Sequence, residues 1–165
     1  SVDIAKIDRE ETYPEAPGQL NTEYEDVQTI AADAAVIVEI SVDDQKVVML
    51  DGYPQTHTIV NVHQVYQGDI DIGDFLEVVE EGGYDGKVMG GLPLLSKENK
   101  YVLFLNEYKG YYYICGAFQG RFIEREGYLF QQATADVKLD TYSPLSITDF
   151  SAELIDLIEK NTIEK

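Results

Sequence analysis

Two histidines offer the most direct route to chemistry in this sequence, because imidazole is the commonest transition-metal ligand. His57 and His63 lie within residues 56–66, where side chains alternate in the manner of a β-strand. Six residues of a straight strand span about 20 Å, which is too far for two ligands of one ion. The sequence therefore predicts two polar positions on a half-exposed strand and no metal site.

The acidic run at residues 69–74 superficially resembles a calcium-binding loop, in which a tight turn gathers carboxylate oxygens. Its order departs from that pattern, because glycine takes the fifth position and aspartate the sixth, where an oxygen ligand and then glycine are required. We expect Ile70 and Ile72 to point into the core while the flanking aspartates face water. An opportunistic surface calcium site is the alternative.

Five glycines and a proline fall within residues 82–93. A phosphate-binding glycine loop needs a helix directly after it and usually a lysine that reaches the phosphates. Lys87 lies inside the stretch, no helical pattern follows it, and the neighbouring Glu80 and Glu81 would repel an anion. We therefore predict a long mobile loop between two strands.

Nucleophilic catalysis finds little support in the sequence. Cys115 is the only cysteine, so no internal disulfide can form, and no base stands beside it to activate the thiol. A cysteine in a strand-like run is usually a small buried hydrophobe. No Gly-x-Ser-x-Gly motif accompanies either histidine. We expect no catalytic residue and no cofactor; a hydrolase built on His57 or His63 with distant carboxylates is the least favoured alternative.

Three consecutive tyrosines are the best candidates for contact with a ligand. In a strand, Tyr112 lies on the opposite face from Tyr111 and Tyr113, so at least one ring should face solvent. Residues 97–125 also carry five basic and three acidic side chains, whereas the rest of the chain is strongly acidic. The candidate ligand-binding residues are Lys109, Tyr111, Tyr112, Tyr113, Arg121 and Arg125. They would form a patch for an acidic or polymeric partner; the alternative is that tyrosine is simply a good strand former.

A β-rich fold must position these residues. Short β-branched and alternating runs, separated by turn residues, predict strands at residues 34–42, 46–50, 56–66, 75–79, 101–105, 111–118, 121–125 and 128–132. Residues 43–45 are the predicted turn between the first two strands.

The C-terminal segment changes to helical spacing. An apolar stripe follows a capping box formed by Ser146 and Asp149, and it predicts an amphipathic helix over residues 149–160. The stripe consists of Phe150, Leu154, Leu157 and Ile158. The sequence thus predicts a mainly β fold, a small antiparallel β-barrel or curled sheet, with this helix covering an open end or edge.

Length and charge limit the possible functions. The 165 residues fit one domain, and a net charge of -19 repels polyanions, which excludes nucleic acid as a partner. Residues 1–26 hold eight acidic and two basic side chains together with Pro14 and Pro17. We interpret residues 1–26 as an acidic N-terminal tether and residues 27–165 as a single domain.

Four motifs carry a family resemblance: Glu-Gly-Gly-x-x-Gly at 81–86, Leu-Pro-Leu-Leu at 92–95, Lys-Tyr-Val-Leu-Phe-Leu at 100–105 and Gln-Gly-Arg-Phe at 119–122. With these motifs, residues 34–132 resemble uncharacterised bacterial cell-surface or lipoprotein domains. The resemblance implies a small β-barrel related in outline to the OB and netrin-like folds, and it implies no established activity. Netrin-like inhibitors use an N-terminal cysteine and disulfides, which this sequence lacks, so protease inhibition does not carry over.

These observations predict a non-catalytic, surface-displayed binding or interaction domain whose partner is a protein or a polysaccharide. A single cysteine, high acidity and a start at Ser1, which suggests a removed leader, favour the cell surface or exterior of a bacterium. Membrane contact is expected only through a removed lipid anchor. A carbohydrate-binding module that uses exposed tyrosines is the main alternative.

Overall fold

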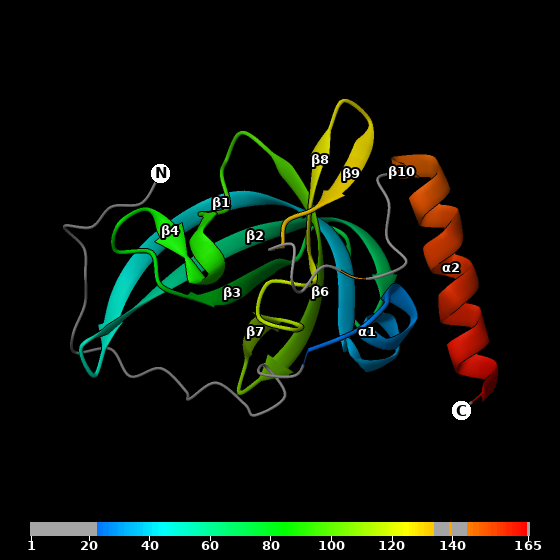
Figure 1. Ribbon diagram of the computed structural model, residues 1–165, viewed down its shortest axis with the longest axis horizontal. Coiled ribbons are helices and arrows are strands. Elements are labelled where there is room, and N and C mark those ends of the chain that lie inside the picture. The colour runs from blue at the N-terminus through cyan, green and yellow to red at the C-terminus, as the bar shows by residue number, and fades with distance from the viewer. Residues whose placement is uncertain (1–22, 134–138, 140–144, 165) are drawn as a thin grey trace.

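The computed structural model describes residues 23–133, 139 and 145–164. Strands make up most of this part of the chain, and a helix lies near each of its ends (Figure 1). In chain order the elements are α1 (Val27–Asp33), β1 (Val36–Leu50), β2 (Tyr53–Gln67), β3 (Phe75–Glu81), β4 (Lys87–Val88), the 3-10 turn η3 (Met89–Gly91), β5 (Leu92–Pro93), β6 (Lys100–Tyr108), β7 (Tyr111–Ile114), β8 (Arg121–Arg125), β9 (Tyr128–Gln131), β10 (Leu145–Ser146) and α2 (Ile147–Glu164).

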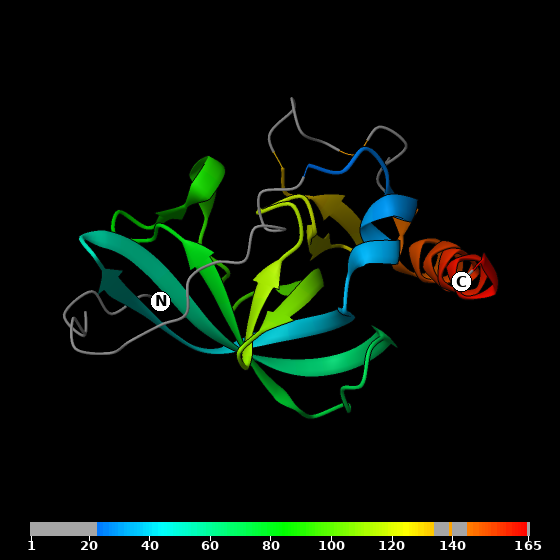
Figure 2. The same ribbon diagram turned by 90° about the horizontal axis from the view of Figure 1, so that it is seen from below.

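A circuit of strand pairings curls the main sheet. β1 pairs with β2, β2 with β3, β3 with β7 and β7 with β6, and β6 pairs back with β1. β8, β9 and β10 extend the sheet beyond β6, and α2 lies beside this extension (Figures 1 and 2). The predicted mainly β fold, a curled sheet with a C-terminal helix, is confirmed. It departs from an antiparallel arrangement at β3 and β7, which pair in parallel.

β1 and β2 are 15-residue strands that form one long hairpin. The turn predicted at residues 43–45 is wrong, because the register shifts there and the strand continues. A β-bulge accommodates one extra residue without ending a strand, so turn-type residues are tolerated at that point. The chain reverses at Asp51 and Gly52 instead, whose φ angles of 49° and 84° are the left-handed pair that a tight hairpin requires.

The two faces of the curled sheet bury separate apolar clusters. Ile40, Val78 and Leu103 belong to the cluster inside the curl. Ile37 and Phe122 belong to the cluster on the outer face, which α1 and α2 cover. Alternation along each strand therefore supplies both clusters, and it explains why β1 and β6 are apolar at most positions of their shared pairing.

The chain joins the domain before α1. The backbone N–H of Tyr24 donates to Oε1 of Gln119 at 2.7 Å, and its carbonyl accepts from Nε2 of Gln119 at 2.8 Å. Asp26 then caps α1 by accepting a hydrogen bond from the backbone N–H of Thr29 at 2.8 Å. Residues 1–22 of the predicted tether lie outside the described residues, whereas Tyr24 is part of the folded domain.

The predicted C-terminal helix is confirmed and is longer than expected at both ends. Ser146 Oγ accepts a hydrogen bond from the backbone N–H of Asp149 at 3.2 Å, as predicted. Leu154 is 1% exposed and Ile158 packs against the outer cluster, while the side chain of Phe150 lies outside the described residues. No helix among the described residues has the length and apolar character needed to cross a bilayer.

Three loop predictions are corrected by the structure. Within the predicted loop at 82–93, residues 87–93 form β4, η3 and β5, a small hairpin. Ile70 packs against the inner cluster as predicted, but Ile72 is 65% exposed. β7 ends at Ile114 because the chain turns through Gly116 and Ala117, whose φ angles are 66° and 64°. The apolar residues around Cys115 do not indicate this turn in the sequence.

Candidate functional site in a cleft between β3 and β7

The three tyrosines of β7 lie on two faces of the sheet, as alternation predicts. Tyr112 packs against the inner cluster, and Tyr111 lies edge-on to His57 with ring centroids 5.8 Å apart. Tyr113 is 3% exposed, and the other two are half-buried. The expected solvent-facing ring is therefore not found in this triplet.

The basic residues predicted beside the tyrosines do not gather into one patch. Lys109 is exposed in the turn between β6 and β7, with Nζ 5.3 Å from the ring centroid of Tyr108. Arg125 is exposed at the end of β8. Arg121, at the start of the same strand, is 0% exposed, so its guanidinium does not contribute to a surface patch. A ligand-binding role for Lys109 and Arg125 remains a prediction.

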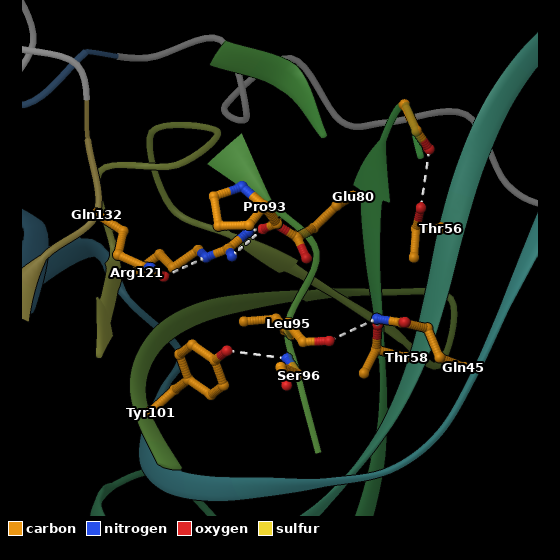
Figure 3. Close-up of polar contacts among 11 residues, drawn as sticks. Gln45, Thr56, Thr58, Glu80, Pro93, Leu95, Ser96, Tyr101, Arg121 and Gln132 are labelled. Atoms are coloured by element: carbon orange, nitrogen blue, oxygen red, sulfur yellow. Dashed lines mark hydrogen bonds and ion pairs between the residues drawn. The ribbon is translucent and has the colours of Figure 1, made fainter. Parts of the chain in front are cut away.

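Arg121 is instead the centre of a buried polar network inside the curl (Figure 3). Its Nη1 donates to Oε2 of Glu80 at 2.8 Å, and its Nε donates to Oε1 of Gln132 at 2.8 Å. Its Nη2 donates to the carbonyl of Pro93, and its guanidinium carbon lies 5.9 Å from the ring centroid of Tyr101. Burying a charge this deeply requires such partners on every side.

Further hydrogen bonds attach the segment after η3 to the sheet (Figure 3). Gln45 Nε2 donates to the carbonyl of Leu95 and to Oγ1 of Thr58, each at 3.0 Å. Tyr101 Oη accepts from the backbone N–H of Ser96 at 2.9 Å. Together with the bond from Arg121 to Pro93, these contacts fix the small β4–β5 hairpin and the chain after it against the strands below.

A cleft opens where β3 and β7 part. Val79 and Tyr113 are the last paired residues of the two strands. Beyond them, β3 continues along β2 and β7 continues along β6. Val88 and Met89 line the gap between the two strands. The cavity volume of the cleft is about 40 Å³. It is lined by Gln55, Val79, Glu80, Glu81, Val88, Met89, Tyr113, Ile114, Ala117 and Phe118.

Glu80 brings an incompletely satisfied carboxylate to this cleft. It occupies an inward position of β3, in line with Leu76 and Val78, and it is 6% exposed. Burial raises the pKa of its carboxyl, and Arg121 opposes that effect by its charge and its hydrogen bond. Oε2 is bonded to Arg121, but Oε1 is buried and has no hydrogen-bond partner among the described residues. Such an acceptor costs free energy until a donor reaches it.

Tyr113 contributes a second buried polar atom without a hydrogen-bond partner in the described part of the chain. Its hydroxyl is buried and has no hydrogen-bond partner among residues 23–133, 139 and 145–164. Burial, followed by the charges of Tyr111, Tyr108 and Glu77, raises the pKa of Tyr113 to about 12, so the phenol is neutral at physiological pH. Because Tyr113 is paired with Val79, alternation places it on the opposite sheet face from Glu80. Glu80 and Tyr113 thus both line the cleft, and each has one buried polar atom without a hydrogen-bond partner among the described residues.

The two histidines have different partners. His57 is 1% exposed, which corrects the half-exposed prediction, and its Nδ1 lies 2.7 Å from Oε2 of Glu77. His63 is half-buried at a bulge of β2, where the register shifts, and its Nε2 lies 2.7 Å from Oγ of Ser41. The carboxylate and the serine hydroxyl therefore contact different histidines, and the hydrolase alternative gains no assembled Ser-His-carboxylate triad from these contacts.

Two acidic side chains, Glu39 and Glu124, lie close together on the outer face. Burial, then a hydrogen bond with Glu39 and the charge of Glu39, raise the pKa of Glu124 to about 8, while Lys100 opposes the shift. The register places Ser41 opposite Lys100 and Glu39 opposite Val102, so β1 and β6 bring these polar groups to one face. The pKa of Glu124 is thus raised by its burial and by its acidic neighbour.

Cys115 is a core residue, as predicted. It is 0% exposed in the outer cluster, and burial raises the pKa of its thiol to about 12. A thiol in this state is a poor nucleophile. Across the described ranges, no three His, Cys, Asp or Glu residues lie close enough together to hold a metal ion.

The sequence contains a signal for the buried network, but the predicted site includes Arg121 only as a surface residue and omits Glu80. Glu80 follows Leu76 and Val78 at alternate positions, which places a carboxylate on an inward face. Arg121 stands directly before the apolar pair Phe122 and Ile123. Opposite charges at two inward strand positions indicate a buried ion pair. Nothing local in the sequence predicts that Phe118 and Met89 meet beside it.

Comparison with known proteins gives no relationship to build on. No protein-family model matches the chain, and no curated protein matches it significantly.

Proposed function

We propose that this protein is a non-catalytic binding domain that takes part of its ligand into the cleft between β3 and β7. The carrying observation is the buried, unpartnered Oε1 of Glu80, which lines an otherwise largely apolar cleft. Ligand sites commonly combine apolar walls with a few convergent polar groups. An acceptor left unsatisfied in the free protein is a place where ligand binding gains a hydrogen bond without losing an existing one.

The same residues favour binding over catalysis. A general base or nucleophile must reach the substrate and exchange a proton near the working pH. Tyr113 holds its proton until a pH of about 12, and the bonded oxygen of Glu80 is occupied by Arg121. The cleft therefore offers contact and hydrogen bonding. Display at a bacterial surface, and kinship with OB-like surface domains, remain part of the proposal; acidic composition and the circuit of five strands support them.

An uncharged fluorescent probe tests this proposal. N-phenyl-1-naphthylamine has an apolar body and one N–H donor, and its fluorescence rises when it leaves water. We expect saturable binding at one site. Met89→Trp, at the 43% exposed rim of the cleft, should weaken binding about tenfold or more. Ile155→Trp, at a 49% exposed position on α2, is the matched control. Equal binding by both variants would place the probe elsewhere and remove the support for this site.

A carbohydrate-binding function has its own structural support, at a different place from the predicted tyrosines. Tyr128 and Phe130 are 49% and 39% exposed and lie two residues apart on β9, hence on one face. They line a shallow groove of about 540 Å³ together with Arg125 and Asn99. Two neighbouring aromatic rings with polar side chains around them suit a sugar face. Glycan-array binding that Tyr128→Ala abolishes and Tyr112→Ala preserves would favour this function.

A further inference from the structure

The cleft contains charges that select among ligands, and the following inference rests on the proposed binding function. Glu80 and Arg121 are both buried, with side chains 4% and 0% exposed, and are joined by a 2.8 Å contact. Their charges cancel within the cleft. Glu81, exposed at the rim, is the remaining charged lining residue.

A cationic group is a poor match for Oε1 of Glu80. It would have to give up its water in an apolar cleft, which is costly for an ion. The carboxylate that should attract it is already neutralised by Arg121, and the guanidinium would repel a second cation nearby. The attraction of the rim residue Glu81 is screened by solvent. The ion pair therefore removes most of the electrostatic attraction that would have to offset the desolvation cost of an ammonium group.

An anionic group is a worse match. It brings no hydrogen for Oε1 of Glu80, and it faces Glu80 and Glu81 in a protein of net charge -19. The donors of Arg121 that could attract it are bonded to Glu80, Gln132 and Pro93. An uncharged group with an O–H or N–H avoids both difficulties, because it donates to Oε1 and carries a much smaller desolvation cost.

We propose that the ligand of the β3–β7 cleft is an uncharged molecule, or an uncharged part of one, that carries a hydroxyl or amide N–H donor on an apolar body. The donor bonds to Oε1 of Glu80, and the apolar body lies against Val88, Met89 and Phe118. A carbonyl or hydroxyl elsewhere on the ligand accepts a hydrogen bond from Tyr113, which also lines the cleft and whose hydroxyl has no partner among the described residues.

Four probes with the same phenyl body test this selectivity. Benzyl alcohol and benzamide are neutral donors, benzylamine is a cation at neutral pH, and benzoate is an anion. Binding is followed in the full chain through the backbone amide shifts of Val88, Met89 and Ile114 in nitrogen-15 NMR titrations. We expect both neutral probes to bind, and benzylamine and benzoate to bind about tenfold more weakly or not at all.

The outcomes separate this inference from the proposed function. If benzylamine or benzoate binds as tightly as the neutral probes, the selectivity argument is overturned while the cleft remains a binding site. If none of the four probes shifts the cleft amides, and N-phenyl-1-naphthylamine also fails to bind, both proposals are overturned.

A charge-removing variant gives a second readout. In Glu80→Gln, Arg121 loses its counter-charge, so benzoate should gain affinity and overtake benzylamine by about tenfold. Glu81→Gln, at the exposed rim, is the matched control and should keep the neutral preference. An unchanged order of affinities in folded Glu80→Gln would show that the ion pair does not set the selectivity. If Glu80→Gln does not fold, the four-probe comparison in the unaltered protein decides.

Discussion

Nη1 of Arg121 lies 2.8 Å from Oε2 of Glu80, and this ion pair joins β8 to β3, two strands that are not neighbours in the sheet. The contact therefore crosses the interior of the curl and does not follow a hydrogen-bonded ladder. It fixes the carboxylate on one wall of the cleft and, through Pro93, the segment above the cleft. The stability of the fold and the proposed ligand selectivity of the cleft thus depend on the same ion pair.

Breaking this pair from one side should destabilise the protein strongly. Arg121→Ala leaves the carboxylate of Glu80 buried without a counter-charge, and we expect a loss of about 3–5 kcal/mol in the free energy of unfolding. Arg125→Ala, on the same strand but exposed, should change it by less than about 0.5 kcal/mol. Urea unfolding followed by circular dichroism measures both. The double variant Arg121→Met with Glu80→Leu should recover much of the loss, and equal losses in all three variants would contradict this account.

The outer carboxyl pair predicts a stability that falls with rising pH. Because the pKa of Glu124 is raised to about 8 from an ordinary 4.5, its contribution is complete below pH 4.5 and is lost as the pH rises through about 8. Tm should therefore drop between about pH 4.5 and pH 8, and Glu124→Gln should flatten that part of the profile. Glu126→Gln, exposed in the adjacent turn, is the control and should leave the slope unchanged. A carbon-13 titration that gave Glu124 an ordinary pKa would contradict this account.

Two glycines in the stretch before β4 should respond very differently to alanine. A Cβ at Gly83, where φ is +114°, would lie 1.8 Å from Oγ1 of Thr56, whereas a Cβ at Gly86, where φ is +83°, meets nothing within 4 Å. Gly86→Ala should cost about 1–2 kcal/mol for the left-handed backbone alone. Gly83→Ala adds a clash with the core and should cost more than about 3 kcal/mol, or shift the β4–β5 hairpin. Thermal unfolding of the two variants compares them directly, and equal costs would mean that the close approach to Thr56 is absent.

The single thiol should be unreactive in the folded protein. Cys115 is 0% exposed and its pKa is raised to about 12, so a disulfide reagent at pH 8 meets neither an accessible sulfur nor a thiolate. Labelling should follow the rate of unfolding and increase steeply with urea. Tyr53→Cys combined with Cys115→Ala places the thiol at a 75% exposed position and should react at once. Rapid stoichiometric labelling of the unaltered protein would show that Cys115 is accessible.

Local patterns predicted the fold well and the site poorly. Alternation identified β2, β3 and β8, and the i, i+4 stripe identified α2, because each pattern reflects burial against one face. Residues 43–45 predict a turn but form a β-bulge, since turn-type residues serve in both. The charge balance of residues 97–125 places Arg121 in a surface patch, whereas its position before two apolar residues indicates burial.

The cleft itself depends on contacts between distant parts of the chain. Phe118 and Met89 line the gap because a turn after β7 and the β4–β5 hairpin meet there, and neither meeting has a periodic signature. Phe118 approaches so closely that a Cβ on Gly90 would lie 3.0 Å from its ring. Long-range packing of this kind is decided by the whole fold, so no window of sequence contains it.

The parallel junction of β3 with β7 rests on the pairs Val78–Tyr112 and Val79–Tyr113, the shortest link in the circuit of five strands. A link held by so few ladder hydrogen bonds separates more readily than the long hairpin opposite, because little cooperative structure must melt with it. Amide hydrogens there should exchange with solvent sooner than those of β1 and β2. We therefore expect a ligand to enter the cleft at this junction, because separating two residue pairs disrupts the least structure.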